Sequence, residues 1–235
     1  MASQAEAELR QLVADAGRIL YRLGLTDYMG HASARIPGTD RIVIKPRHSV
    51  RIRAMDRVAP EDLIIIDMDG NFVEGGDGPP AERFIHTCIY RARPDVQSVV
   101  HTHQPMATIL GVAGQPILPI LHVESPLVEQ PVPIWPCAKL VTDDDLGEQL
   151  ASALGEHGVC LLQGHGIVSV AASVKEATIG AVHLERLADA NYKVLAINKQ
   201  PRVIPPDEIR QLKERGVGVD VRWAYYAELA GVQLD

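Results

Sequence analysis

Cysteine is scarce in this chain of 235 residues, and its three cysteines are far apart in the sequence. Cys88, Cys137 and Cys160 show no CxxC spacing. The pattern therefore indicates neither a disulfide framework nor a zinc site built from thiolates. A chain without disulfides suits a reducing compartment, and we expect a cytoplasmic location.

Long apolar runs and an excess of positive charge are also missing. No apolar run reaches the roughly 18 residues of a membrane span, and the acidic first residues lack the basic and apolar segments of a secretory signal. The formal net charge of -7 disfavours a general surface for nucleic acid or anionic membranes, because polyanions repel an acidic protein. We therefore expect no nucleic-acid partner and no membrane partner.

The composition that is present, with 46% hydrophobic and 23% charged residues, is that of an ordinary soluble globule. Neither an internal repeat nor a low-complexity linker divides the chain, so we expect one domain over residues 1–235. Apolar periodicity, capping residues and prolines predict helices over residues 5–23, 82–93, 105–112, 143–154, 173–198, 205–215 and from 222 onward.

Two histidines, His101 and His103, follow a predicted strand over residues 96–100. Side chains two residues apart in an extended chain point to the same face, so both imidazoles project together. Such a pair can bind a metal ion, although histidines also occur as ordinary polar residues at strand ends.

A third histidine, His165, lies between two glycines in a tight turn that joins two predicted strands. The glycines permit the sharp turn and leave the imidazole accessible. Three nitrogen ligands with an open fourth position are typical of a catalytic divalent-metal site rather than a structural one. The sequence by itself leaves the distance between His165 and His101 open.

Residues 45–53 are the most basic segment of the chain. One interpretation is a solvated loop, and the other is a pocket wall that binds carboxylate or phosphate. Glu82 opens a predicted helix, where a carboxylate commonly does no more than favour the helix dipole. His86 and His183 lie within predicted helices, and we interpret both as packing or hydrogen-bonding residues.

An ordered series of segments resembles the class II aldolase/adducin family over most of the chain, from the first helix to about residue 198. The segments are Glu-Arg-Phe-Ile-His-Thr-Cys-Ile-Tyr at 82–90, Arg-Pro-Asp at 93–95, Val-Val-His-Thr-His at 99–103, and Gly-His-Gly at 164–166 ahead of the Glu-Ala helix at 176–177. The resemblance implies that His101, His103 and His165 bind a divalent metal and that Glu82 is an acid/base near it.

The same resemblance implies an α/β fold, namely a three-layer α/β/α sandwich with a central, mostly antiparallel sheet. It also implies a homotetramer whose sites lie between subunits. The metal in such proteins is usually zinc, with manganese, cobalt or iron in some branches.

Three segments depart from the sugar-phosphate aldolases of this family, which hold phosphate with Gly-Asn-Xaa-Ser, a Thr/Ser-Gly turn and two serines before the acidic residue. The corresponding residues here are Gly-His-Ala-Ser at 30–33, Pro-Arg-His at 46–48 and Pro-Pro-Ala-Glu at 79–82. Prolines provide neither hydroxyls nor N–H donors for a phosphate. We expect a carboxylate substrate instead, because guanidinium pairs bidentately with carboxylate. The expected binding residues are the cationic donors Arg47, His48, His31 and Arg51, together with Ser33.

These departures resemble the decarboxylase branch, whose substrates include dihydroxyphthalates and hydroxy-carboxymuconic semialdehydes. We expect a metal-dependent carboxy-lyase acting on such an acid through a metal-stabilised enolate. Glu82 is the first candidate for the proton shuttle, with His31, Tyr225 or Tyr226 as other donors. The alternatives are a retro-aldol aldolase or epimerase acting on a sugar or hydroxy-acid, and a non-catalytic, adducin-like scaffold.

Overall fold

One mixed sheet organises the computed structural model, which describes residues 4–50, 52, 54–128 and 131–234. Within these residues eight strands follow the order β4-β3-β2-β1-β5-β8-β7-β6, and only the β6–β7 pair is parallel. The strands are β1 His31–Arg35, β2 Arg41–Ile44, β3 Ile64–Asp67, β4 Phe72–Glu74, β5 Ser98–Thr102, β6 Ile134–Trp135, β7 Val159–Leu162 and β8 Gly166–Ala171.

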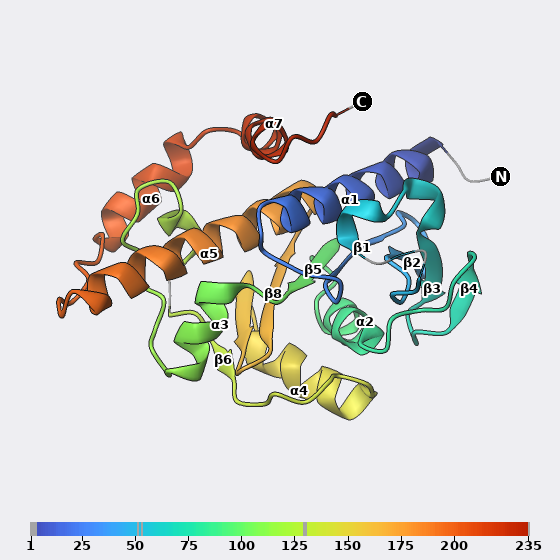
Figure 1. Cartoon of the computed structure of the whole chain (residues 1–235), viewed down its shortest axis with the longest axis horizontal. Coiled ribbons are helices and arrows are strands. Elements are labelled where there is room, and N and C mark those ends of the chain that lie inside the picture. Colours follow the sequence, from blue (N-terminus) through green and yellow to red (C-terminus); the bar gives the residue numbers. More distant parts are fainter. Residues whose placement is uncertain (1–3, 51, 53, 129–130, 235) are drawn as a thin grey trace.

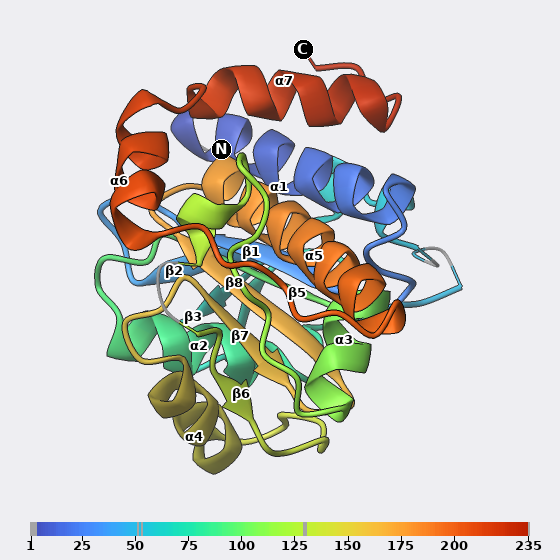
Figure 2. The ribbon, with the colours of Figure 1, turned by 90° about the vertical axis from the view of Figure 1, so that its left-hand side faces the viewer.

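Helices cover both faces of this sheet, with α1, α5 and α7 on one side and α2 and α4 on the other (Figures 1 and 2). The helices are α1 Gln4–Arg22, α2 Arg83–Ala92, α3 Pro105–Val112, α4 Asp144–Leu154, α5 Val174–Ala196, α6 Pro206–Arg215 and α7 Val219–Leu229. Three short 3-10 helices, Met55–Arg57, Pro60–Asp62 and Ser125–Leu127, lie in the connections. The expected three-layer α/β/α sandwich with a mostly antiparallel sheet is confirmed.

Alternation along the central strands divides the apolar core in two. Val43 of β2 and Val100 of β5 pack in the cluster that includes α1 and α5, whereas Ile42 and Val99 pack in the cluster that includes α2. Successive side chains of a strand point to opposite faces, so every second residue serves one core. His101, two residues after Val99, consequently points to the α2 side of the sheet.

The helix bounds agree with the sequence predictions to within a few residues. The last helix begins at Val219 rather than at residue 222. Among its described residues, the proline-rich segment between residues 114 and 139 contributes only the 3-10 helix Ser125–Leu127 and the two-residue strand β6. None of the described helices is long and apolar enough to cross a membrane.

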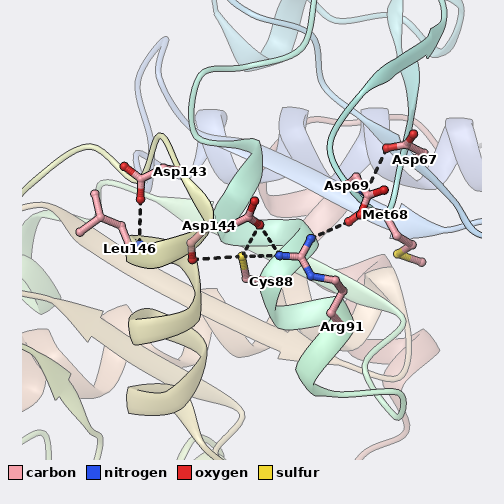
Figure 3. Close-up of polar contacts among 8 residues, drawn as sticks. All are labelled: Asp67, Met68, Asp69, Cys88, Arg91, Asp143, Asp144 and Leu146. Carbon is pink, nitrogen blue, oxygen red and sulfur yellow. Dashed lines mark hydrogen bonds and ion pairs between the residues drawn. The ribbon is translucent and has the colours of Figure 1, made fainter.

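Packing between α2 and α4 fixes the start of α2, where Glu82 is the N-cap residue. Arg91 of α2 donates to the Asp144 carboxylate at the start of α4 and to the Met68 carbonyl in the β3–β4 turn (Figure 3). Gly147 of α4 sits directly against α2, because a Cβ there would lie 2.8 Å from the Phe84 carbonyl oxygen and would collide with Cys88. Only glycine allows the two helices to approach so closely.

Gly147→Ala is therefore expected to lower the free energy of unfolding by about 1–3 kcal/mol, the usual cost of overpacking. Urea denaturation measures the change. Gly76→Ala is the matched control, since a Cβ at Gly76 would meet nothing within 4 Å and should leave the denaturation midpoint unchanged. Equal midpoints for Gly147→Ala and the parent protein would contradict this account of the helix packing.

Candidate metal centre

Four side chains from three parts of the chain converge at one end of β5. They are Glu82 at the start of α2, His101 in β5, His103 just beyond β5, and His165 in the β7–β8 turn. One potential ligand atom from each lies within 4.8 Å of all the others. The sequence left the distance between His165 and His101 open, and the fold brings them together.

Pairing between β5 and β8 produces this convergence. His101 lies opposite Val168 and Thr102 opposite Ile167, so the turn that carries His165 falls beside His103. Gly164 adopts φ +69, a conformation that L side chains rarely tolerate. At Gly166 a Cβ would lie 3.0 Å from the His103 ring, so the second glycine permits the close approach.

The three histidines leave metal-binding nitrogens without partners. The Nε2 atoms of His101, His103 and His165 are buried and accept no hydrogen bond from any described residue. His101 Nδ1 lies 2.9 Å from the Ile167 carbonyl oxygen, to which it donates, and this fixes the tautomer with a lone pair on Nε2. Buried polar atoms ordinarily have partners, so this donor set fits a divalent metal ion.

The protonation state of the histidines also suits metal binding. Burial lowers the pKa of His101 to about 3 and also lowers the pKa of His103. Both imidazoles are therefore neutral near pH 7, which is the form that binds a metal ion.

Glu82 is buried with one oxygen fixed and its carboxylate beside two of the imidazoles. Its Oε1 accepts a hydrogen bond from the Val141 N–H at 3.0 Å and lies 3.5 Å from His165 Nε2, while Oε2 lies 3.8 Å from His101 Nε2. Burial alone would raise the pKa of Glu82, but the neighbouring His165 and His101 and the Val141 amide lower it to about 2. An ionised carboxylate here can hold or accept a proton at the centre, or contribute to metal binding.

Ser33, one of the residues expected to bind the substrate, has no exposed surface in the structure. Its hydroxyl is fully buried and hydrogen-bonded to His86 and Tyr90, so Ser33 is not available as a direct substrate ligand. His31 lies opposite His101 in the β1–β5 pair and is also buried. Burial and the neighbouring His86 hold the pKa of His31 well below its usual value, which makes it a neutral donor rather than the cationic donor expected from sequence.

The remaining predicted residues lie farther from the four-residue cluster. Arg47 and His48 are exposed in the loop after β2, where the Arg47 N–H donates to the Gly78 carbonyl at 2.9 Å and the His48 ring packs against Tyr28. Arg51 lies outside the described residues. Tyr225 is exposed on α7 and packs edge-on against Tyr226, so this single chain does not bring it to the cluster.

Sequence reasoning missed Lys45 as an individual site residue. Lys45 is 3% exposed, and to the described residues its ammonium makes only long hydrogen bonds, 3.4 and 3.5 Å, to the carbonyls of Tyr28 and Pro46. Its charge acts on His31 and on Asp27, whose carboxylate lies 3.9 Å from His103. Burial lowers the pKa of Lys45 to about 8, which still leaves a cation near pH 7. Its place at the end of an apolar strand was the available signal.

Comparison with known proteins agrees with this geometry. Residues 11–192 match the Class II Aldolase and Adducin N-terminal domain. A 3,4-dihydroxyphthalate decarboxylase of Arthrobacter keyseri is 31% identical, with 96% of this chain and 94% of the relative covered. A 5-methylthioribulose-1-phosphate/5-deoxyribulose-1-phosphate aldolase of Rhodospirillum rubrum is also 31% identical, with 88% and 90% covered.

Among solved structures, an aldolase II superfamily protein from Pseudomonas syringae superposes with a TM-score of 0.80 at 26% identity, over 97% of this chain and 94% of that one. Relatives of this kind are enzymes that depend on a divalent metal, and the cluster of Glu82, His101, His103 and His165 supplies a place for one. The chain belongs to the class II aldolase and adducin family, whose members similar to it include both decarboxylases and sugar-phosphate aldolases or epimerases.

Proposed function

We propose that the protein is a metal-dependent decarboxylase of a hydroxylated aromatic acid resembling dihydroxyphthalate, or of a ring-cleavage β-keto acid. The observation that carries the proposal is a buried cation, Lys45, whose charge acts on His31, the imidazole that packs against His101 of the centre. Among the described residues Lys45 forms no ion pair, since Asp27, whose charge acts on it, lies beyond ion-pair distance, and a buried cation without a close anion is costly. A substrate carboxylate supplies that anion.

The residues around the centre suit a carboxylate better than a phosphate. Pro79 and Pro80 directly precede Ala81 and Glu82, and neither proline has a backbone N–H to donate. The loop that contains Pro79 and Pro80 contacts the loop of Arg47 through the Gly78 carbonyl. Lys45 binds one carboxylate of the substrate at the floor of the site, and Arg47 and His48 bind a second carboxylate at the rim.

When bound, a divalent ion supplies a Lewis acid that stabilises negative charge on an oxygen next to the bond that breaks. Glu82, with Oε1 held by the Val141 amide, accepts a proton from the substrate hydroxyl and returns one to the carbon that loses carbon dioxide. The buried faces of β1 and β5 exclude water around the leaving carboxylate.

We further propose that zinc is the metal and that the chain is a single domain over residues 1–235 that forms a homotetramer. The resemblance to the family implies an assembly with sites between subunits. In such an assembly Tyr225, which is exposed on α7, serves the centre of a neighbouring subunit as a proton donor.

Incubation of the zinc-loaded protein with a substrate panel tests the activity. The panel contains 3,4-dihydroxyphthalate, a hydroxy-carboxymuconic acid, sugar phosphates, and 3,4-dimethoxyphthalate as a control that lacks the free hydroxyls. We expect carbon dioxide from a hydroxylated acid, no carbon dioxide from the dimethoxy control, and loss of the activity after chelation of the metal. Release of carbon dioxide is measured directly.

The second candidate is an aldolase or epimerase for a sugar phosphate, which the similarity to the Rhodospirillum rubrum aldolase favours. It predicts an aldehyde or an epimerised sugar and no carbon dioxide. If only the phosphorylated sugars react, the decarboxylase proposal is wrong.

A further inference from the structure

A chain of four side chains, linked by short hydrogen bonds, is buried between β1 and α2. Tyr90 OH lies 2.8 Å from Ser33 Oγ, Ser33 Oγ lies 2.6 Å from His86 Nδ1, and His86 Nε2 lies 2.7 Å from His31 Nδ1. None of the four residues is more than 2% exposed. Ser33 and His31 lie two residues apart on one face of β1, and His86 and Tyr90 lie one turn apart on one face of α2.

Proton counting gives this chain a direction. Ser33 Oγ is the only hydrogen-bond acceptor for the Tyr90 hydroxyl among the described residues, so Tyr90 donates to Ser33. Ser33 then donates its own hydroxyl proton to His86 Nδ1. The proton of a neutral His86 is left on Nε2 and is donated to His31 Nδ1, and a neutral His31 carries its proton on Nε2.

The His31 end of this hydrogen-bonded series lies at the metal centre. His31 is directly opposite His101 in the β1–β5 pair, and their ring centroids are 5.1 Å apart. Residues directly opposite in antiparallel strands project from the same face of the sheet. No described residue forms a hydrogen bond with His31 Nε2, which leaves this N–H free for a ligand.

We propose that Tyr90, Ser33 and His86 are positioning residues that hold His31 in the Nε2–H tautomer, so that His31 presents a neutral N–H donor to a substrate oxygen at the metal centre. This inference rests on the proposed function for the identity of that oxygen, a carboxylate or ring oxygen of a hydroxylated acid. A neutral imidazole N–H stabilises negative charge that develops on such an oxygen without delivering a full positive charge beside the metal ligands.

The alternative tautomers of His86 and His31 show why the hydrogen bonds from Tyr90 and Ser33 are needed. If His86 carried its proton on Nδ1, it would donate to Ser33, and His31 would donate from Nδ1 to His86. His31 Nε2 would then present a lone pair beside His101, repelling a substrate oxygen and competing for the metal. With Tyr90 donating to Ser33, this arrangement would leave the Ser33 hydroxyl proton without an acceptor among the described residues, which disfavours it.

Nitrogen-15 NMR of histidine-labelled, zinc-loaded protein without substrate tests the tautomers. We expect protonated Nε2 and unprotonated Nδ1 for both His31 and His86. Ser33→Ala removes the donor to His86 Nδ1, and Tyr90→Phe removes the donor to Ser33 while keeping the ring. Both variants are expected to shift His31 toward the Nδ1–H form. A parent protein with His31 protonated on Nδ1, or variants with unchanged His31 signals, would overturn the proposal.

Ser169→Ala is the matched control, because Ser169 is equally buried in β8 but donates to the Ala177 carbonyl, outside the chain. It should leave the signals of His31 and His86 unchanged. Thermal melting of each variant verifies folding. If Ser33→Ala does not fold, Tyr90→Phe carries the test alone.

Kinetics on the acid identified by the substrate panel give a second readout. His31→Phe is expected to lower kcat by about 10²- to 10³-fold, the usual effect of losing one donor to developing charge. Ser33→Ala lowers kcat by about 10-fold or more in the parent background, with kcat/KM falling in parallel. In the His31→Phe background Ser33→Ala has no further effect on kcat, because it acts through His31. Independent, multiplicative losses would overturn the proposal.

The two proposals fail separately. The NMR result needs no substrate, so an inactive substrate panel with the expected tautomers would contradict the decarboxylase assignment alone. Carbon dioxide release together with the wrong tautomer would contradict only the positioning role of Tyr90, Ser33 and His86.

Discussion

His101→Ala is expected to leave the protein almost free of metal and to lower kcat by about 10³-fold or more. His101 supplies one of three unpartnered Nε2 atoms, and the Ile167 carbonyl orients its ring. A Lewis acid contributes several kcal/mol to stabilisation of charge, and each 1.36 kcal/mol corresponds to a tenfold change in rate. Elemental analysis after dialysis against a weak chelator measures the metal, and turnover of the identified substrate measures the activity.

Two further variants separate loss of the metal from loss of the fold. His103→Ala removes a ligand whose side chain is 22% exposed, so it disturbs the core less and should also lose the metal. His183→Gln removes a buried imidazole on α5 that lies outside the four-residue cluster and should keep the metal. Full metal content in His101→Ala would contradict the assignment of the centre.

Local patterns in the sequence were sufficient for most of the fold. Apolar periodicity, Ser173 as an N-cap and Pro105 at a helix start predicted the helices, because these features act within a few residues of the chain. The order of strands in the sheet was not derivable in the same way. Pairing such as His31 with His101 joins residues 70 positions apart, and the family resemblance implied only a mostly antiparallel sheet.

The candidate metal ligands were named from resemblance combined with spacing, whereas the residues around them needed the structure. His86 looked like any histidine within a helix, and its contacts with His31 and Ser33 are visible only in the structure. Ser33 was expected to touch substrate, but β1 turns it toward α2. Lys45 appeared as one of several basic residues, and its burial distinguishes it from Arg47.

Glu82→Gln is expected to lower kcat by about 10²- to 10⁴-fold, the range for loss of a general acid/base. Glutamine has the same shape, and its amide oxygen can still accept from the Val141 N–H, so the start of α2 should keep its position. Three imidazoles remain for the metal, and we expect the metal content at saturating zinc to stay near that of the parent. The measurement pairs turnover with elemental analysis.

Glu124→Gln is the matched control, because Glu124 is equally buried but pairs with Arg186 away from the centre. It should retain the metal and nearly all of the activity. Loss of metal in Glu82→Gln comparable to that in His101→Ala would make Glu82 a ligand whose carboxylate is needed for binding. Retention of both metal and activity would remove Glu82 from the chemistry. The acid/base role requires loss of turnover with the metal in place, and it follows from a carboxylate that one amide fixes while the imidazoles of His101 and His165 face it.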